Sequence, residues 1–148
     1  MIQRIQTVYL LFVAFIMIAT LFFPLGFIIS DADSTLTTFD MFGIHGESEL
    51  VRWPLFALPI CSILLAVITI FYYNKRKLQV NLSYLTILLI VLIYILGGIF
   101  LRDLIQTNTA SFSFTCILPL VALVFEILAI LRIKKDIRIL RSGDRIRP

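Results

Sequence analysis

The sequence predicts an all-α fold, an integral membrane bundle of four transmembrane helices. Of its 148 residues, 60% are hydrophobic and only 15% are charged, which lies outside the usual balance of a soluble domain. Four windows without Lys or Arg are each long enough to cross a hydrocarbon core of about 30 Å at about 1.5 Å per residue. We expect helices at about 5–29, 53–73, 82–101 and 111–131 within a single domain, 1–148.

The distribution of positive charge predicts how these helices are oriented. The N-terminus, the connection between the second and third helices, and the tail hold 11 of the 13 basic residues. The loop 30–52 instead contains five acidic residues and only Arg52. Cytoplasmic flanks of membrane helices are enriched in Lys and Arg. Both termini are therefore expected in the cytoplasm, with the loop 30–52 outside.

The first segment has two features of a cleaved signal peptide, since Arg4 precedes an apolar run and Ser30-Asp31-Ala32 has the small-x-small form of a cleavage site. A signal has an apolar region of about 7–15 residues, and this run is longer, so we expect the segment to be retained as a helix. Pro24, Pro59 and Pro119 fall in the outer halves of their predicted helices, where a proline can kink the backbone.

Small and polar residues predict which side of the fourth helix faces protein. They recur at spacings of four and three and so lie along one helical stripe: Thr115, Pro119, Ala122, Glu126 and Ala129. Helices in lipid associate through small side chains and hydrogen bonds. Gly97 and Gly98 are expected to provide a second point of close helix approach.

Glu126 is the one acidic residue inside a predicted span, and an ionisable residue at this depth is costly enough to be a candidate site. It lies about 9 Å from Arg132 along the helix. Thr69, Thr86 and Tyr9 are expected at the same depth and form the candidate polar site with it. Glu126 could lock helix register, bind a proton or cation, or contact a partner subunit.

The tail 132–148 is predicted to continue the last helix as a basic amphipathic segment. Ile133, Ile137 and Leu140 recur at helical spacing. Basic residues on the other faces are candidates for contact with anionic lipid or a protein partner: Arg132, Lys134, Lys135, Arg138 and Arg141. Alternatively, these charges only fix the topology.

No motif predicts catalysis, a cofactor or a metal site. His45 lies in the acidic loop without a ligand spacing typical of zinc or copper. Cys61 and Cys116 both fall in outer helix halves; a disulfide is conceivable, and buried free thiols are the expected state. No hydrolase, metalloprotease or nucleotide-binding motif is present, so we expect no enzyme activity. The net charge of +4 reflects topology and does not require nucleic-acid binding.

Both ends of the chain resemble a known family. The opening Met1 to Leu10 (MIQRIQTVYL) and the closing stretch from Lys134 to Arg147 resemble a domain-of-unknown-function family of small four-helix membrane proteins from Bacteroidota. The resemblance implies the four-helix fold and a location in the bacterial inner membrane. It implies no activity and no site residues.

Two functions follow from these features. The first is a membrane interaction or scaffold protein that contacts lipid or a partner through its tail and outer loop. The alternative is a small oligomeric transporter or ion-coupled carrier with Glu126 in its pathway, which requires partner copies because one four-helix bundle has little interior space.

Overall fold

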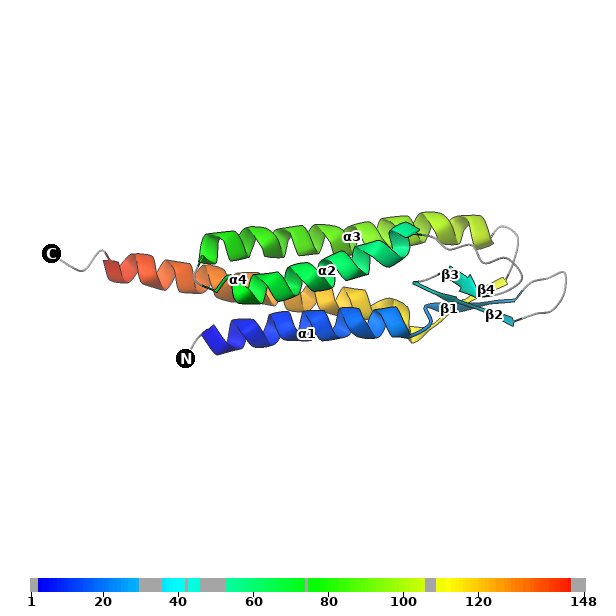
Figure 1. Ribbon diagram of the computed structural model, residues 1–148, viewed down its shortest axis with the longest axis horizontal. Coiled ribbons are helices and arrows are strands. Elements are labelled where there is room, and N and C mark those ends of the chain that lie inside the picture. The colour runs from blue at the N-terminus through cyan, green and yellow to red at the C-terminus, as the bar shows by residue number, and fades with distance from the viewer. Residues whose placement is uncertain are drawn as a thin grey trace.

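The structure, a computed structural model, describes residues 3–29, 36–41, 43–45, 53–73, 75–105 and 109–144. This part of the chain forms a long bundle of four helices with a small sheet at one end (Figure 1). Both ends of the chain lie at the opposite end of the bundle. The helices are α1 (Gln3–Phe22), α2 (Trp53–Phe71), α3 (Arg76–Ile105) and α4 (Leu118–Asp144), with a 3-10 turn, η1 (Phe114–Ile117), before α4.

In the described part of the chain, three helices are long and apolar enough to cross a membrane, which indicates a membrane protein. The apolar stretches are Ile5–Phe22, Arg76–Phe100 and Phe114–Leu140. The apolar part of α2, Leu55–Phe71, is shorter. Large hydrophobic side chains such as Phe15, at 66% exposed, cover the outside of the bundle, as expected for a surface that lies in lipid.

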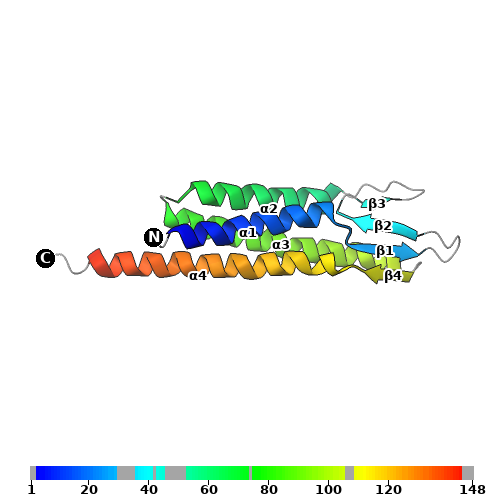
Figure 2. The ribbon, with the colours of Figure 1, turned by 90° about the horizontal axis from the view of Figure 1, so that it is seen from below.

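The helices pack in a ring, in which α1 and α3 each contact both α2 and α4 (Figure 2). Their buried faces form one apolar core, which contains Val13, Met17, Ala66 and Ile90. The core continues under the sheet through other buried side chains, namely Leu25, Phe39, Met41 and Leu55. The bundle and the sheet therefore share one core.

The strands of the sheet are β1 (Gly26–Ile29), β2 (Leu36–Asp40), β3 (Gly43–His45) and β4 (Thr109–Phe112). They are antiparallel, in the order β3-β2-β1-β4. The all-α expectation missed this sheet. Strand β1 is the central link, because Gly26 pairs with Phe39 of β2 on one side and with Phe112 of β4 on the other. The hydrogen bond from Leu25 N to Phe39 O and the one from Ser113 N to Leu25 O extend this pairing to the helix ends.

The sheet changes the bounds of two predicted helices. The expected helix 5–29 ends at Phe22, and Pro24 follows its end instead of kinking it. The expected helix 111–131 starts at Leu118, because residues 109–112 pair with β1, and Pro119 occupies its first turn, where a proline costs no helical hydrogen bond. The same helix continues through the predicted tail to Asp144. Pro59 alone lies inside a helix, as expected.

The stripe of small and polar residues on α4 faces protein, as predicted. Ala122, Glu126 and Ala129 are fully buried, and Thr115 is 9% exposed. The expectation for Gly97 and Gly98 was wrong. A methyl group added at either glycine would meet nothing within 4 Å, so the two residues line an open space and do not bring two helices together.

Candidate functional site

Glu126 is fully buried in the first third of α4, and its carboxyl group has no hydrogen-bond partner among the described residues. A carboxyl group in this state is costly, because burial removes its bonds to water and the protein supplies no replacement. The helix stripe explains its position, since Ala122 and Ala129 flank it on the same buried face. The sequence therefore placed this side chain correctly.

The predicted partners of Glu126 do not bind it. Thr69 and Thr86 are fully buried, but each hydroxyl donates to a backbone carbonyl of its own helix, that of Leu65 and Leu82 respectively. A buried threonine in a helix commonly donates its hydroxyl to the carbonyl oxygen four residues earlier when no partner on another helix accepts it. The ring of Tyr9 packs at 6.2 Å from that of Phe125, the residue before Glu126.

The residue that faces Glu126 is Ser83 of α3, which sequence analysis missed. It is fully buried, and its hydroxyl interacts with the carboxyl group without reaching hydrogen-bond geometry. Ser83 belongs to a buried polar stripe on α3 with Gln79 and Thr86, at spacings of four and three. That spacing was visible in the sequence and could have identified it. Beyond this stripe, Ile90 and Ile93 continue the same face with apolar side chains.

A second polar pair lies at the end of the bundle that carries the termini. The amide nitrogen of Gln6 donates a hydrogen bond to the carboxylate of Asp136, and both side chains are at most 5% exposed. Val80, Ile130 and Ile133 form a small apolar cluster of their own, which Ile137 joins. The predicted amphipathic tail is therefore part of the bundle as far as Ile137, because its apolar face packs on α3 and its Asp136 bonds to α1.

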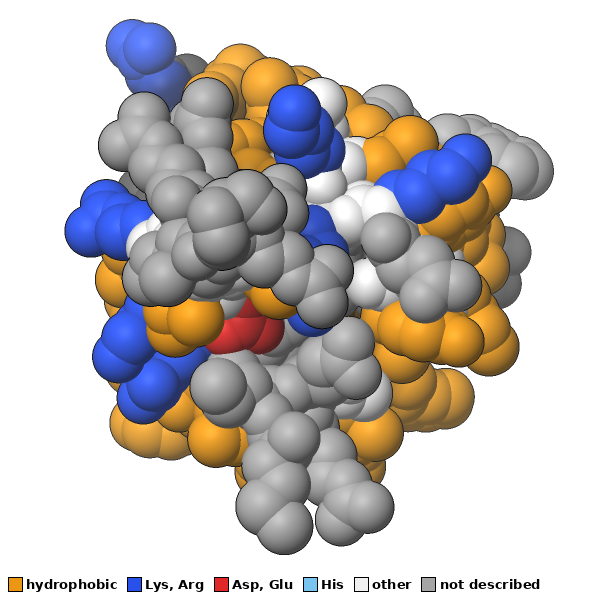
Figure 3. All heavy atoms as spheres, turned by 90° about the vertical axis from the view of Figure 1, so that its left-hand side faces the viewer, with side chains coloured by type: hydrophobic (Ala, Val, Ile, Leu, Met, Phe, Trp, Pro, Cys, Tyr) orange, Lys and Arg blue, Asp and Glu red, His pale blue; other side chains and the backbone are white. Residues whose placement is uncertain are grey.

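Basic side chains surround this same end (Figure 3). Lys134 is held against α3, where its ammonium group donates to the Tyr84 hydroxyl at 2.6 Å and lies 5.2 Å from the ring centre. Asp136, the one acidic side chain described at this end, is buried, so the surface is strongly positive. The side chain of Arg141 lies outside the described residues. The predicted contact residues Arg132, Lys134, Lys135 and Arg138 are exposed, as are Lys75 and Lys77.

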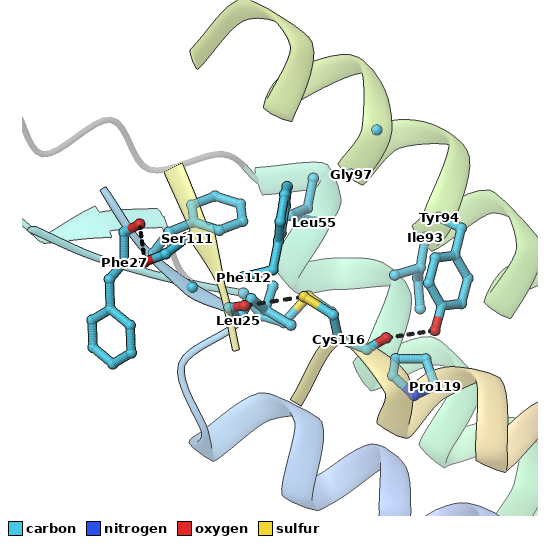
Figure 4. Close-up of a pocket in the computed structure, with 14 residues that line it drawn as sticks. Leu25, Phe27, Leu55, Ile93, Tyr94, Gly97, Ser111, Phe112, Cys116 and Pro119 are labelled. Atoms are coloured by element: carbon cyan, nitrogen blue, oxygen red, sulfur yellow. Dashed lines mark hydrogen bonds between the residues drawn. The ribbon is translucent and has the colours of Figure 1, made fainter. Parts of the chain in front are cut away.

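A pocket of about 200 Å³ lies at the other end of the bundle, between the sheet and the helices (Figure 4). No local sequence pattern predicts this pocket, because its walls come from five separate parts of the chain. The sheet contributes residues of β1, β2 and β4, and the helical wall includes Leu55 of α2, Ile93 and Gly97 of α3, and Pro119 of α4.

Three polar side chains at the pocket bond to backbone carbonyl oxygens (Figure 4). The Tyr94 hydroxyl donates to Cys116 O at 2.7 Å, and the Cys116 thiol donates to Leu25 O at 3.0 Å. The Ser111 hydroxyl donates to Phe27 O at 3.3 Å. These bonds tie α3 to the 3-10 turn, the turn to the start of β1, and β4 to β1. They also leave the pocket with a predominantly apolar lining.

Cys61 and Cys116 are both free thiols. Cys61 is exposed on α2, while Cys116 is half-buried at the pocket, so only one of the two has the expected buried environment. His45 ends β3, where its backbone pairs with Thr38, and its side chain lies outside the described residues. Most of the loop 30–52 also lies outside them, apart from residues 36–41 and 43–45.

A family model described as "Domain of unknown function (DUF4293)" matches residues 2–146. No curated protein matches the chain.

Proposed function

Because the chain belongs to the DUF4293 family of unknown function, we propose its role from its own geometry: a membrane interaction or scaffold protein that contacts anionic lipid through its basic end. The observation that carries this proposal is the convergence of exposed Lys and Arg side chains from α3 and α4 on one end of the bundle (Figure 3). Each basic side chain near an anionic membrane surface contributes about 1 kcal/mol of attraction. Asp136, the one acidic side chain described at this end, is buried and does not offset this attraction at the surface.

We place the chain in a bacterial inner membrane with four spans and both termini in the cytoplasm. The 19 residues of α2 extend about 28 Å at helical rise, close to the hydrocarbon thickness of about 30 Å. Tyr72 and Tyr73, which follow α2 at the basic end, are exposed, as is typical of tyrosines at a membrane interface. The excess of Lys and Arg at this end supports a cytoplasmic position for it.

The test is the retention of anionic lipid by protein purified from bilayers that contain phosphatidylglycerol and phosphatidylcholine. The variant Lys135→Glu/Arg138→Glu reverses two exposed charges at the basic end, and native mass spectrometry counts the lipids that each protein retains. We expect the parent to retain phosphatidylglycerol preferentially and the variant to lose that preference.

The matched control is Arg102→Glu, a charge reversal on an exposed residue in the last turn of α3, at the sheet end of the bundle. We expect it to retain phosphatidylglycerol like the parent. An equal loss in both variants, or in neither, would show that the basic end has no specific role in lipid binding.

A second candidate function is an ion-coupled carrier that uses Glu126. The specific observation in its favour is a group of three buried oxygen atoms without hydrogen-bond partners, the two of Glu126 and the hydroxyl oxygen of Ser83. A proton or a small cation with water would satisfy them. Against this, Glu126 is fully enclosed in the single copy, so a carrier needs a second copy or another conformation.

Infrared difference spectra between the parent and Glu126→Gln in bilayers separate the two functions. In a carrier, the carboxyl band changes with pH near neutrality and shifts quickly in deuterated water. In a scaffold, where Glu126 only fixes helix packing, the band stays constant across pH and resists exchange.

A further inference from the structure

We propose that the pocket between the sheet and the helices binds one acyl chain of a bilayer lipid. The pocket measures about 200 Å³. An engineered apolar cavity of about 150 Å³ is large enough to bind benzene and stays free of water. The space under the sheet therefore accommodates a run of several methylene groups, and it is too large to be a packing defect between side chains.

The chemistry of the lining selects an apolar occupant. The wall consists mainly of aliphatic and aromatic side chains, among them Phe39, Met41, Leu55 and Ile93, and none of the described residues that line it is charged. The hydroxyls of Tyr94 and Ser111 and the thiol of Cys116 already donate to carbonyl oxygens. A water molecule needs two to four polar partners in such a site, and these donors are not free to supply them.

The pocket is continuous with the lipid-facing surface of the protein. Three residues of its wall reach that surface on the side where α3 passes β4, since Tyr94 is 38% exposed, Phe112 is 59% exposed, and Gly98 is also exposed. Apolar side chains next to these wall residues in the sequence are exposed as well, namely Ile95 and Ile99 on α3 and Phe114 in the 3-10 turn. An acyl chain can therefore enter from the bilayer while its headgroup stays at the interface.

Two adjacent glycines keep the helical wall open. Ideal methyl groups built on Gly97 and Gly98 meet no atom within 4 Å, although both residues line the pocket. In a helix interior, glycine is less favourable than alanine by about 1 kcal/mol. The absence of side chains here costs helix stability and leaves the room that a lipid chain would fill.

This site is independent of the proposed role of the basic end, because it lies at the opposite end of the bundle and contains no charge. The ligand we commit to is a phospholipid chain from the leaflet next to the sheet. Free fatty acid offers the same chain, and a carboxylate at the opening would find no basic side chain among the residues that line the pocket.

The test uses a phosphatidylcholine that carries a photoactivatable diazirine on its acyl chain, in nanodiscs with the full-length protein. After irradiation, peptide mass spectrometry locates the adducts. We expect adducts on the pocket residues of segments 93–98 and 111–119. A Cβ built on Gly97 meets no atom within 4 Å, so in Gly97→Leu we expect the new side chain to occupy the pocket and these adducts to be lost, while adducts on the exposed Leu88 remain.

The matched control is Ile95→Phe, which adds bulk on the same helix at an exposed residue outside the pocket lining. It should keep the pocket adducts. Thermal unfolding shows whether Gly97→Leu is folded, and if it is not, Gly98→Leu fills the same wall and replaces it. Pocket adducts no stronger than those on Leu88 in the parent would overturn the proposal. Pocket adducts that survive in the folded filling variant would also overturn it.

Unlabelled lipids identify the source of the chain. An excess of unlabelled phosphatidylcholine should abolish the pocket adducts. Competition by free palmitate but not by phosphatidylcholine would overturn the assignment to a bilayer lipid.

Discussion

Gly26 has a specific steric role at the centre of the sheet. A methyl group at this position would lie 2.8 Å from the backbone oxygen of Ser111, closer than carbon and oxygen atoms can approach. Strands β1 and β4 are thus in contact at a point where any side chain would separate them. Gly98 differs from Gly26, because a methyl group added at Gly98 would meet no atom within 4 Å and would lie in open space.

This contrast predicts opposite effects of one substitution. Gly26→Ala should destabilise the protein by about 1–3 kcal/mol, the usual cost of overpacking. Gly98→Ala should stabilise it by up to about 1 kcal/mol through helix propensity. Unfolding in increasing fractions of denaturing detergent measures both. Equal shifts for the two variants would show that the contact between β1 and β4 does not constrain residue 26.

Among the buried polar side chains, we expect that of Ser83 to contribute least to the free energy of unfolding. Its hydroxyl forms no hydrogen bond among the described residues, so Ser83→Ala removes a desolvated group without breaking a bond. We expect the free energy of unfolding to change by less than about 0.5 kcal/mol or to rise. A loss above about 1 kcal/mol, the typical value of one hydrogen bond, would show that Ser83 bonds to Glu126 in the bilayer.

At the scale of elements, the bond between Gln6 and Asp136 joins the start of α1 to the last turns of α4. Both side chains are buried, so neither can be satisfied by solvent after its partner is removed. Together with the packing of Ile133 and Ile137, this bond makes the inner part of the predicted tail a structural part of the bundle.

Gln6→Leu should therefore cost about 1–3 kcal/mol or more, because it leaves the carboxylate of Asp136 buried without a donor. The double variant Gln6→Leu/Asp136→Leu removes both polar groups and should recover a large part of that loss. Unfolding of the single and double variants measures the coupling. Additive losses would mean that the two residues act independently.

At the scale of the whole molecule, the two ends of the bundle differ in charge and in structure. Exposed basic side chains gather at one end (Figure 3), and the sheet covers the other (Figure 1). In the proposed orientation, the basic end faces the cytoplasm and the sheet faces outward. All four helices run between these ends, so the orientation of any one of them fixes the rest.

The orientation predicts which introduced cysteines a membrane-impermeant maleimide reaches in intact cells or spheroplasts. In a chain with Cys61→Ala and Cys116→Ala, Arg102→Cys at the sheet end should be labelled from outside. Ser142→Cys, exposed near the end of α4, should react only after the membrane is opened. The reverse labelling would place the termini outside. Labelling of both residues from outside would show that α4, the one helix between them, does not cross the membrane.

Residues close in sequence determined much of the fold. Helical hydrogen bonds join residues four apart, so apolar runs and side-chain spacing alone predicted four helices and the buried face of α4 that carries Glu126. The spacing of Gln79, Ser83 and Thr86 contained the same kind of information and could have revealed the polar stripe on α3.

Only the tertiary structure decided the sheet, the pocket and the polar partners. Strand β4 pairs with β1 across at least 80 positions, and Gln6 bonds to a residue 130 positions away. No local pattern encodes such contacts, because backbone pairing depends on where the helices bring two distant segments. The sequence by itself determined that the chain forms helices long and apolar enough to cross a membrane, because length and hydropathy are properties of each segment alone. Long-range packing decided how the sheet and the helix ends enclose the pocket.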